Sequence, residues 1–117
     1  RALGYVADAQ LPVALNAVDV ACVLTADSAF GRFSYPAKLC EAMACRRPVV
    51  ASDSGPIRWM LGGAERHLVR MGDADALAQA MLARLDDGAV DYAAPAGWET
   101  VAAGLAALLE GARSGNT

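Results

Sequence analysis

The sequence has few of the residues that mark several common classes of protein. It holds one histidine and three cysteines, and none of them stands at the spacing of metal ligands, so no metal site is expected. No apolar run reaches the roughly 18 to 20 residues that span a membrane, and no segment resembles a signal peptide. The net charge of −3 argues against a nucleic-acid binder, because such proteins normally carry a basic stripe.

The residues that are present fit one soluble domain. A chain of 117 residues with 56% hydrophobic residues can supply a single core. An odd count of cysteines inside expected core elements (Cys22, Cys40 and Cys45) indicates reduced thiols, so we expect a cytoplasmic protein. The chain begins with Arg1, and residues 2–4 read as the tail of a strand already under way, so we expect a piece of a longer protein.

Hydrophobic periodicity predicts alternating strands and helices. Such alternation is typical of an α/β fold with a parallel sheet and right-handed crossovers. The expected elements begin with a strand ending at Tyr5, a helix capped by Asp8 with Leu11, Leu15 and Val18 on its apolar side, a strand buried on both faces over 19–24 and a loop over 25–33. A helix from Pro36 to Cys45, a buried strand over 49–51, a short helix over 57–61 and an edge strand over 67–70 follow. The last elements are a helix capped by Asp73 and running to 86, a linker over 88–97 and a helix over 98–112.

Two helices are expected to turn apolar faces inward. These faces consist of Leu77, Met81, Leu82 and Leu85 in the first, and of Val101, Leu105, Leu108 and Leu109 in the second. The short sheet should leave an apolar edge open, which is a recognised route to association. A homodimer, or a further part of the protein, would cover that edge.

The segment 34–52 is the one around which the chain is organised. Pro36 fits the first position of a helix, with Ser34 or Tyr35 at the cap. Lys38 and Glu41 lie three residues apart and project near each other. A helix start exposes free N–H groups and suits a phosphate. Taken alone, the spacing favours an ordinary amphipathic helix, on which Glu41 is solvated and pairs with Lys38.

Three motifs resemble those of GT-B glycosyltransferases, especially family 4. The first is Pro-x-Lys-Leu-x-Glu-x-Met-Ala, starting at Pro36 and followed by Arg-Pro-Val-Val-Ala-Ser, which resembles the donor-site segment of these enzymes. The second is Leu3-Gly4-Tyr5-Val6 together with Ala17-Val18-Asp19-Val20, which resembles their preceding Gly-x-Val … Ala-Asp-Val block. The third is Trp98-Glu99, which resembles a C-terminal Trp-Glu segment. Together the motifs cover nearly the whole chain in the family's order.

The resemblance implies an α/β, Rossmann-like parallel sheet with flanking helices, the C-terminal portion of a GT-B glycosyltransferase. Residues 1–113 would form part of the donor domain and 114–117 a tail. The parent would be a hexosyltransferase that moves a sugar from a nucleoside-diphosphate sugar, UDP- or GDP-linked, to an unidentified sugar, lipid or protein acceptor. No cofactor and no obligatory metal are implied. The remaining N-terminal part would be a partner, and a membrane surface would be met only through that part.

The resemblance also assigns candidate donor-binding residues, while the catalytic residues stay unknown. Glu41 would hold the ribose hydroxyls, Lys38 would neutralise a phosphate or pair locally, and Val6 would offer its backbone to the base. Asp8 would serve the base or, as we expect, cap a helix. The remaining candidates are Phe33, Ser34, Tyr35 and Pro36, which supply the helix start, and Asp53 and Gly55, which lie beyond the third strand or are only turn residues.

The sequence departs from the family pattern at three places. Many members carry a first Glu eight residues before the second, and Phe33 stands there, which puts the sugar and the activity in question. The usual Gly after the helix is Arg46, and Gly55-Pro56-Ile57-Arg58-Trp59 stands where common members have Gly-Gly-x-x-Glu. The basic residues that clamp the diphosphate would lie upstream of Arg1, so the chain alone is expected to be inactive.

Other functions also fit parts of the sequence. A catalytically inactive homologue would explain Phe33, and Ser52-Asp53-Ser54-Gly55 resembles the phosphate-side turn of nucleotide-sugar epimerases. An unrelated α/β binding or signalling module, such as a receiver-like domain, would need a lysine late in the chain. Lys38 is the only lysine, which disfavours that alternative.

Overall fold

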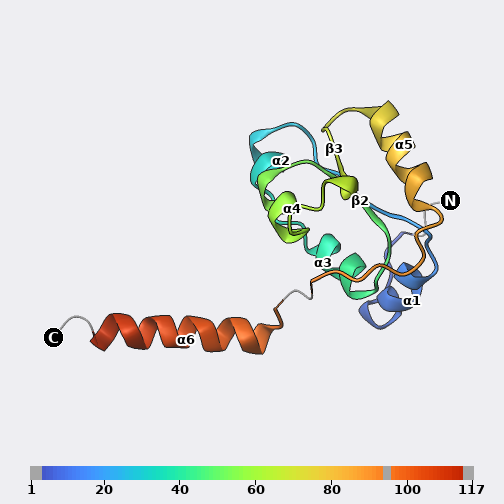
Figure 1. The fold of residues 1–117 in the computed structure, drawn as a ribbon. Helices are drawn as coiled ribbons and strands as arrows, with labels where there is room; N and C mark the ends of the chain where they lie inside the picture. The colour runs from blue at the N-terminus through green and yellow to red at the C-terminus, as the bar shows by residue number, and fades with distance from the viewer. Residues whose placement is uncertain (1–3, 94–95, 115–117) are drawn as a thin grey trace.

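The chain folds around a small parallel sheet (Figure 1). The computed structural model describes residues 4–93 and 96–114. Strands β1 (Ala21–Val23), β2 (Val49–Ser52) and β3 (Leu68–Val69) lie in the order β1-β2-β3, and both pairings are parallel. Ala51 is paired with Val23 on one side and with Leu68 on the other. The predicted α/β class and parallel sheet are confirmed, and β3 lies at an edge as expected.

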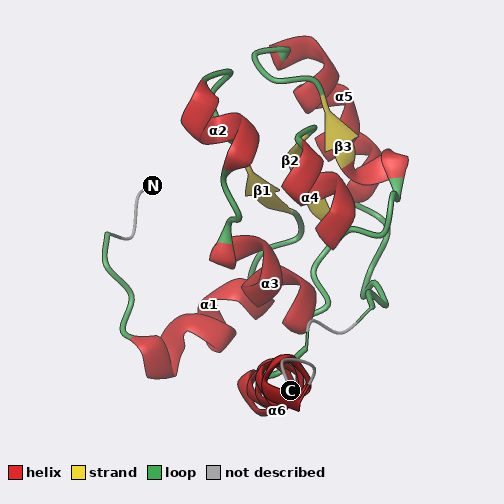
Figure 2. Cartoon of the chain, turned by 90° about the vertical axis from the view of Figure 1, so that its left-hand side faces the viewer, coloured by secondary structure: helices red, strands yellow, loops and turns green. Residues whose placement is uncertain are grey.

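Helices connect the strands and cover the sheet. They are η1 (Asp8–Gln10), α1 (Leu11–Asn16), α2 (Ala29–Phe33), α3 (Ala37–Ala44), α4 (Gly55–Met60), η2 (Glu65–His67), α5 (Ala74–Arg84) and α6 (Trp98–Ser114). Helix α3 packs against β1 and β2, and α5 packs against β2 and β3. In Figure 1, α3 and α4 lie to one side of the sheet and α5 to the other. Figure 2 shows α1 and α3 together below the strands.

The core is built on β2, the central strand. Every residue of β2 is buried, as its unbroken apolar run predicts. Leu39 of α3 and Ile57 of α4 are fully buried beside it and fix these two helices on the sheet. Strand β1 is shorter and less buried than predicted. Of its residues Val23 is buried and Cys22 is exposed, because β1 is an edge strand in the described sheet.

The ends of several elements differ from the predictions. Pro36 is the N-cap of α3 and not its first residue, with φ −78° and ψ 111° and no side-chain cap. Asp8 lies inside the first turn of η1, where Ala7 holds the N-cap position, so the predicted Asp8 cap is wrong. Gly4 and Tyr5 are not in a strand, and the remainder of that predicted strand lies outside the described residues.

The predicted loop over 25–33 contains helix α2, which sequence reasoning missed. The Ser28 Oγ accepts a hydrogen bond from the N–H of Gly31 and caps this helix. Gly31 permits the close turn, because a Cβ atom there would lie 2.0 Å from the carbonyl oxygen of Ala26. A five-residue helix with a glycine in it has too short a hydrophobic pattern to be recognised.

Helix α3 ends where it was predicted to end, near Cys45. The N–H of Arg46 bonds to the Met43 carbonyl and the N–H of Arg47 bonds to the Ala42 carbonyl, which together form a Schellman motif. Arg46 adopts a left-handed conformation with φ 56°. Arg46, which replaces the family's usual glycine, therefore has a backbone conformation that favours glycine.

The last two helices bury less than their sequences predict. Asp73 caps α5 as expected, accepting a hydrogen bond from the Ala76 N–H at 2.9 Å. Leu77 and Met81 are half-buried, but Leu82 and Leu85 are 68% and 49% exposed, so half of the predicted face is wrong. The expected inward residues of α6 are all exposed, because this helix lies apart from the body (Figure 1). Ser114 belongs to α6, and the remainder of the predicted tail, 115–117, lies outside the described residues.

Candidate functional site

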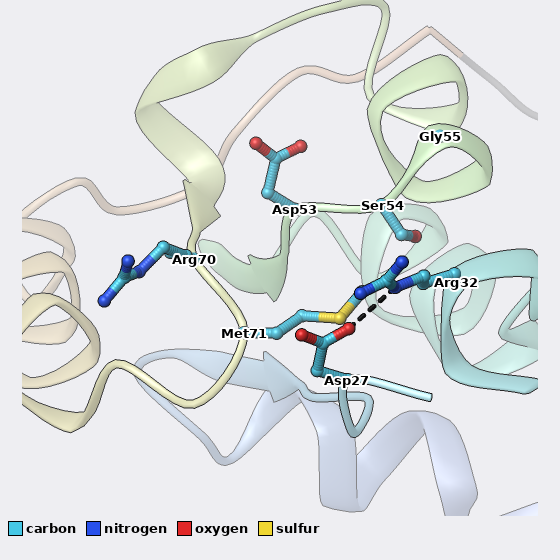
Figure 3. A pocket seen from close by; sticks show the side chains of 7 residues that line it. All are labelled: Asp27, Arg32, Asp53, Ser54, Gly55, Arg70 and Met71. Atoms are coloured by element: carbon cyan, nitrogen blue, oxygen red, sulfur yellow. Dashed lines mark hydrogen bonds and ion pairs between the residues drawn. The ribbon is translucent and has the colours of Figure 1, made fainter. Parts of the chain in front are cut away.

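The turns that follow the three strands enclose an open cavity. Because parallel strands end at the same edge of a sheet, their connecting segments meet there. The cavity has a volume of about 430 Å³ and is drawn in Figure 3. It is lined by Asp27, Arg32, Asp53, Ser54, Gly55, Arg70 and Met71. The predicted location of a ligand site thus coincides with a cavity between these turns.

Two arginines line this cavity, and their side chains differ in their contacts. The Arg32 Nε donates to Asp27 Oδ1 at 2.7 Å, and this hydrogen bond lowers the pKa of Asp27 and raises that of Arg32. Arg70 has an 85% exposed side chain, with its Nε 3.7 Å from the nearer Asp73 oxygen. Figure 3 shows Arg32 beside Asp27, whereas the Arg70 side chain extends away from both. The side chains offer both carboxylate oxygens and guanidinium donors to a ligand.

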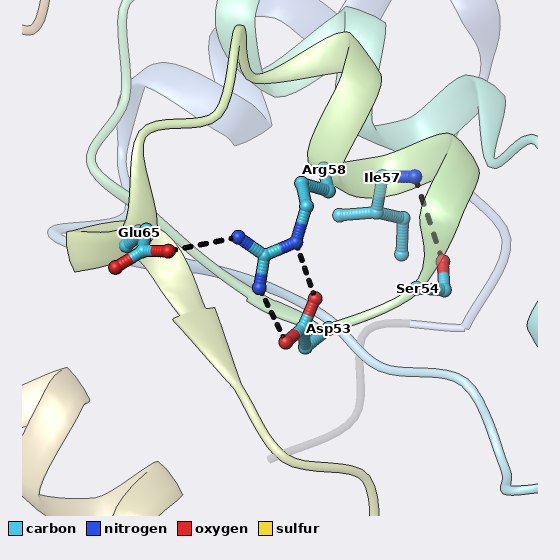
Figure 4. Close-up of polar contacts among 5 residues, drawn as sticks. All are labelled: Asp53, Ser54, Ile57, Arg58 and Glu65. Carbon is cyan, nitrogen blue, oxygen red and sulfur yellow. Dashed lines mark hydrogen bonds and ion pairs between the residues drawn. The ribbon is translucent and has the colours of Figure 1, made fainter.

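A second ion pair holds one wall of the cavity. Both carboxylate oxygens of Asp53 accept from Arg58, at 3.1 Å from Nε and 2.7 Å from Nη2 (Figure 4). Arg58 Nη1 also donates to Glu65 at 3.1 Å, and these bonds raise the pKa of Arg58. Sequence reasoning placed Arg58 beyond the turn without giving it this role. Opposite charges five residues apart across a strand-to-helix turn were the available signal.

The start of α3 forms a separate group of candidate residues. Lys38 is exposed and Glu41 is half-buried on this helix. No ion pair joins these two side chains among the described residues, so the local-pair interpretation finds no support. The ring of Tyr35 lies 6.3 Å from that of Trp59, and burial raises the pKa of Tyr35. Phe33, in place of the family's first Glu, is 82% exposed.

The structure divides the predicted donor residues among three places. Asp53 and Gly55 line the cavity, whereas Lys38 and Glu41 do not. Phe33, Ser34, Tyr35 and Pro36 form the end of α2 and the entry to α3. Val6 is half-buried and Asp8 is exposed, both in the segment that leads into α1. The predicted site residues did not include the other five that line the cavity, Asp27, Arg32, Ser54, Arg70 and Met71.

His67 has a structural environment. It is 2% exposed, its Nδ1 lies 2.9 Å from the carbonyl oxygen of Val49, and Arg66 Nε donates to its Nε2 at 3.2 Å. Its ring also lies 5.5 Å from that of Tyr92, whose hydroxyl donates to the Arg47 carbonyl. Burial lowers the pKa of His67 and favours the neutral ring.

The described residues contain neither of two features that would mark other kinds of site. No three His, Cys, Asp or Glu side chains in 4–93 and 96–114 lie together as a metal site would require. In the same part of the chain, none of the helices has the length and apolar character needed to traverse a bilayer.

The fold defines a class of protein: a Rossmann-like parallel α/β domain with a polar cavity at the carboxyl edge of its sheet, where such domains bind ligands. Residues 1–87 match the family described as glycosyl transferases group 1, and the chain belongs to this family. This assignment confirms the predicted GT-B resemblance and excludes an unrelated signalling module.

A curated relative supports the same assignment. The chain is 43% identical over 86 residues to a phosphatidyl-myo-inositol mannosyltransferase of Mycobacterium leprae (strain TN). The match covers 73% of this chain and 22% of that protein, so the chain spans about a fifth of its relative's length. No solved structure matches the chain.

Proposed function

We propose that the intact protein transfers a hexose from a UDP- or GDP-linked donor to an acceptor, and that this chain contributes the donor site. One observation carries the proposal. A chain of the glycosyl transferases group 1 family presents the Pro36–Glu41 helix start after the strand β1, with Lys38 exposed and Glu41 half-buried on α3. We place the reaction in the cytoplasm, with no cofactor and no obligatory metal.

The start of α3 offers suitable chemistry for a nucleoside diphosphate. Its first intrahelical bond runs from the Leu39 N–H to the Pro36 carbonyl, so the N–H groups of Ala37 and Lys38 precede the bonded turn. Such N–H groups and the positive end of the helix dipole favour phosphate. The Lys38 ammonium would add a full positive charge. The Glu41 carboxylate, one turn further on, would accept hydrogen bonds from the two ribose hydroxyls.

Other predicted residues would complete the donor site. Phe33, Ser34 and Tyr35 would supply backbone amides near the diphosphate, and Val6 would offer its backbone to the base. The relative is named a mannosyltransferase, which favours a hexose as the transferred sugar. Its name also contains phosphatidyl-myo-inositol, so a lipid is the acceptor to test first. Further parts of the protein would supply the acceptor site and basic groups for the diphosphate.

Calorimetry on the intact protein tests the proposed donor site. Glu41→Ala should weaken binding of a UDP- or GDP-sugar by about 1 to 3 kcal/mol, because a charged hydrogen-bond acceptor is lost. Glu99→Ala, which removes an exposed carboxylate from α6, is the matched control and should leave affinity unchanged. Equal affinities of wild type and Glu41→Ala would contradict the assignment of Glu41.

A catalytically inactive homologue is the second candidate function. The exposed ring of Phe33 at the position of the family's first Glu favours it, because that carboxylate would contact the transferred sugar. An inactive homologue would bind the donor without releasing nucleoside diphosphate in the presence of any acceptor. Measuring nucleoside-diphosphate release by the intact protein separates the two candidates.

A further inference from the structure

We propose that residues 88–93, here called the strap, form a pH-sensitive latch. The strap closes over the His67 ring when this ring is neutral, and protonation of the ring releases the strap while the sheet stays folded. The strap lies between α5 and α6 in the chain, so its release would lengthen the tether of α6, which lies apart from the body (Figure 1). The latch is independent of the proposed function, because His67 lies against Val49, at the amino end of β2.

The hydrogen bonds at His67 require the neutral ring. A guanidinium can only donate, and the Arg66 Nε donates to His67 Nε2 at 3.2 Å, so Nε2 carries no proton. The proton of the neutral ring is therefore on Nδ1, which donates to the Val49 carbonyl at 2.9 Å. A second proton would have to bind Nε2. It would break the hydrogen bond from Arg66 and set two donors against each other.

The charged groups around His67 also favour the neutral ring. Burial is the main cause that lowers its pKa, the bond to the Val49 carbonyl raises it, Arg66 and Arg84 lower it, and Asp87 raises it. The Asp87 Oδ2 lies 3.1 Å from Arg84 Nε and 3.7 Å from Arg66 Nη1, so one carboxylate is shared by two guanidinium groups. A proton on His67 would add to this surplus of positive charge. The other charged side chains nearby are engaged elsewhere, in the Arg46–Asp91 and Arg58–Glu65 ion pairs and in the hydrogen bond from Arg47 to the Cys45 carbonyl.

The strap covers His67 through contacts that can open locally. The Tyr92 ring lies 5.5 Å from the His67 ring, and the Tyr92 hydroxyl donates to the Arg47 carbonyl at 2.9 Å. Val90 is buried, and its N–H donates to the Arg46 carbonyl at 2.9 Å. A cavity of about 170 Å³, lined by both His67 and the strap, adjoins these contacts. None of these hydrogen bonds is part of the sheet, so opening the strap would admit water to Nε2 and leave the strands paired.

Amide hydrogen exchange of the intact protein tests the latch, with β2 as the internal reference. In urea too dilute to unfold the protein, exchange of the strap should not respond to urea, because its opening exposes little surface, whereas exchange of β2 should quicken. Corrected for the intrinsic rate, opening of the strap should increase about three- to tenfold from about pH 7.5 to 5.5, since a ring of ordinary pKa about 6.5 sets the tenfold limit. A strap that exchanges in step with β2 at every urea concentration is released only by unfolding, which would overturn the proposal.

Four variants identify the group that controls the strap. His67→Gln should abolish the pH dependence of its opening. Tyr92→Phe is the matched control, because it keeps the ring and loses the hydroxyl bond, and it should speed opening by the same factor at both pH values. Arg66→Met removes a donor and a repelling charge and should flatten the pH dependence, whereas Asp87→Asn removes an attracting charge and should bring it closer to the tenfold limit. These last two variants keep the test decisive if His67→Gln does not fold. An unchanged pH dependence in His67→Gln, or in both Arg66→Met and Asp87→Asn, would overturn the proposal.

Discussion

Arg46 is the residue at which an unfavourable backbone conformation is most evident. Its φ of 56° lies in the left-handed region, where a side chain costs about 1 kcal/mol relative to glycine. Its guanidinium forms an ion pair with Asp91 at 2.8 Å, but both side chains are more than half exposed. Such exposed pairs contribute little. The conformational cost should therefore exceed the benefit of the ion pair.

Arg46→Gly should raise the free energy of unfolding by up to about 1 kcal/mol, because the left-handed conformation suits glycine. Urea denaturation measures this change. Asp91→Ala serves as the control, since it removes the ion pair without altering the backbone preference, and should change stability by less than about 0.5 kcal/mol. A lower stability of Arg46→Gly than of Asp91→Ala would show that the arginine side chain matters more than the backbone.

His67 should make stability depend on pH. Burial is the main cause that lowers its pKa below the usual 6.5, with Arg66 and Arg84 repelling a proton and Asp87 attracting one. The unfolded chain then binds a proton more readily than the folded protein. Stability is therefore fully present above about pH 6.5 and declines as the pH falls through the unfolded and then the folded pKa.

His67 is the single histidine of the chain, so this dependence can be measured directly. The thermal midpoint should decrease as the pH is lowered from about 7.5 to about 5.5. Ordinary carboxylates and thiols titrate little in this range. His67→Gln should be less stable at pH 7.5 but should show a flatter profile over the same range. An equally steep profile in this variant would mean that another group titrates.

The structural role of a single residue was predictable where its neighbours in the sequence determine that role. The Asp73 cap was predicted because an acidic residue stands directly before a strongly periodic helix. The Asp8 cap failed because the same signal preceded only a 3-10 turn. The role of Arg58 depends on the folded structure, which brings Glu65 and the turn at Asp53 within hydrogen-bonding distance of its guanidinium. The local sequence pattern does not predict these contacts.

At the level of elements, the predictions were best where burial and sequence pattern agree. Strand β2 was predicted because its apolar run is buried on both faces, and α3 because Leu39 and Met43 repeat at helical spacing. Helix α2 was missed since it depends on the Ser28 cap and on the tight approach at Gly31 more than on periodicity. The predicted inner face of α6 is exposed because periodicity identifies an apolar face without identifying what covers it.

Helix α6 should drive association of the chain. Its exposed side chains Trp98, Val101, Leu105 and Leu108 repeat at intervals of three and four residues. In proteins most of the stability of a helix comes from packing of its apolar face, and this face of α6 is exposed. We therefore expect light scattering at low micromolar concentration to show a dimer or a larger species.

Substitutions on α6 test the cause of this association. Replacing Leu105 and Leu108 together by Gln should shift the mass towards a monomer, because both side chains lie on the apolar face. Replacing Ala103 and Ala107 together by Gln changes the opposite face and should leave the mass unchanged. If the unmodified chain is a monomer that unfolds cooperatively, the predicted association is wrong.

Considered as a whole, the described part of the chain has a three-stranded parallel sheet with a polar cavity at its carboxyl edge. The class of fold and the family could be predicted from the order of the motifs, and both are confirmed. The site was predicted less completely. The motifs identify the start of α3, but the cavity is formed by three turns that are far apart in sequence.

Hydrogen–deuterium exchange of the intact protein, with and without a UDP- or GDP-sugar, tests whether the start of α3 holds the donor. The donor should slow exchange of the backbone amides of residues 33–41, because these amides would bind the diphosphate. A weaker effect is expected at Val6, next to the base. Protection confined to α5 or α6, with residues 33–41 unchanged at a saturating donor concentration, would contradict the claim that this chain holds the donor at the start of α3.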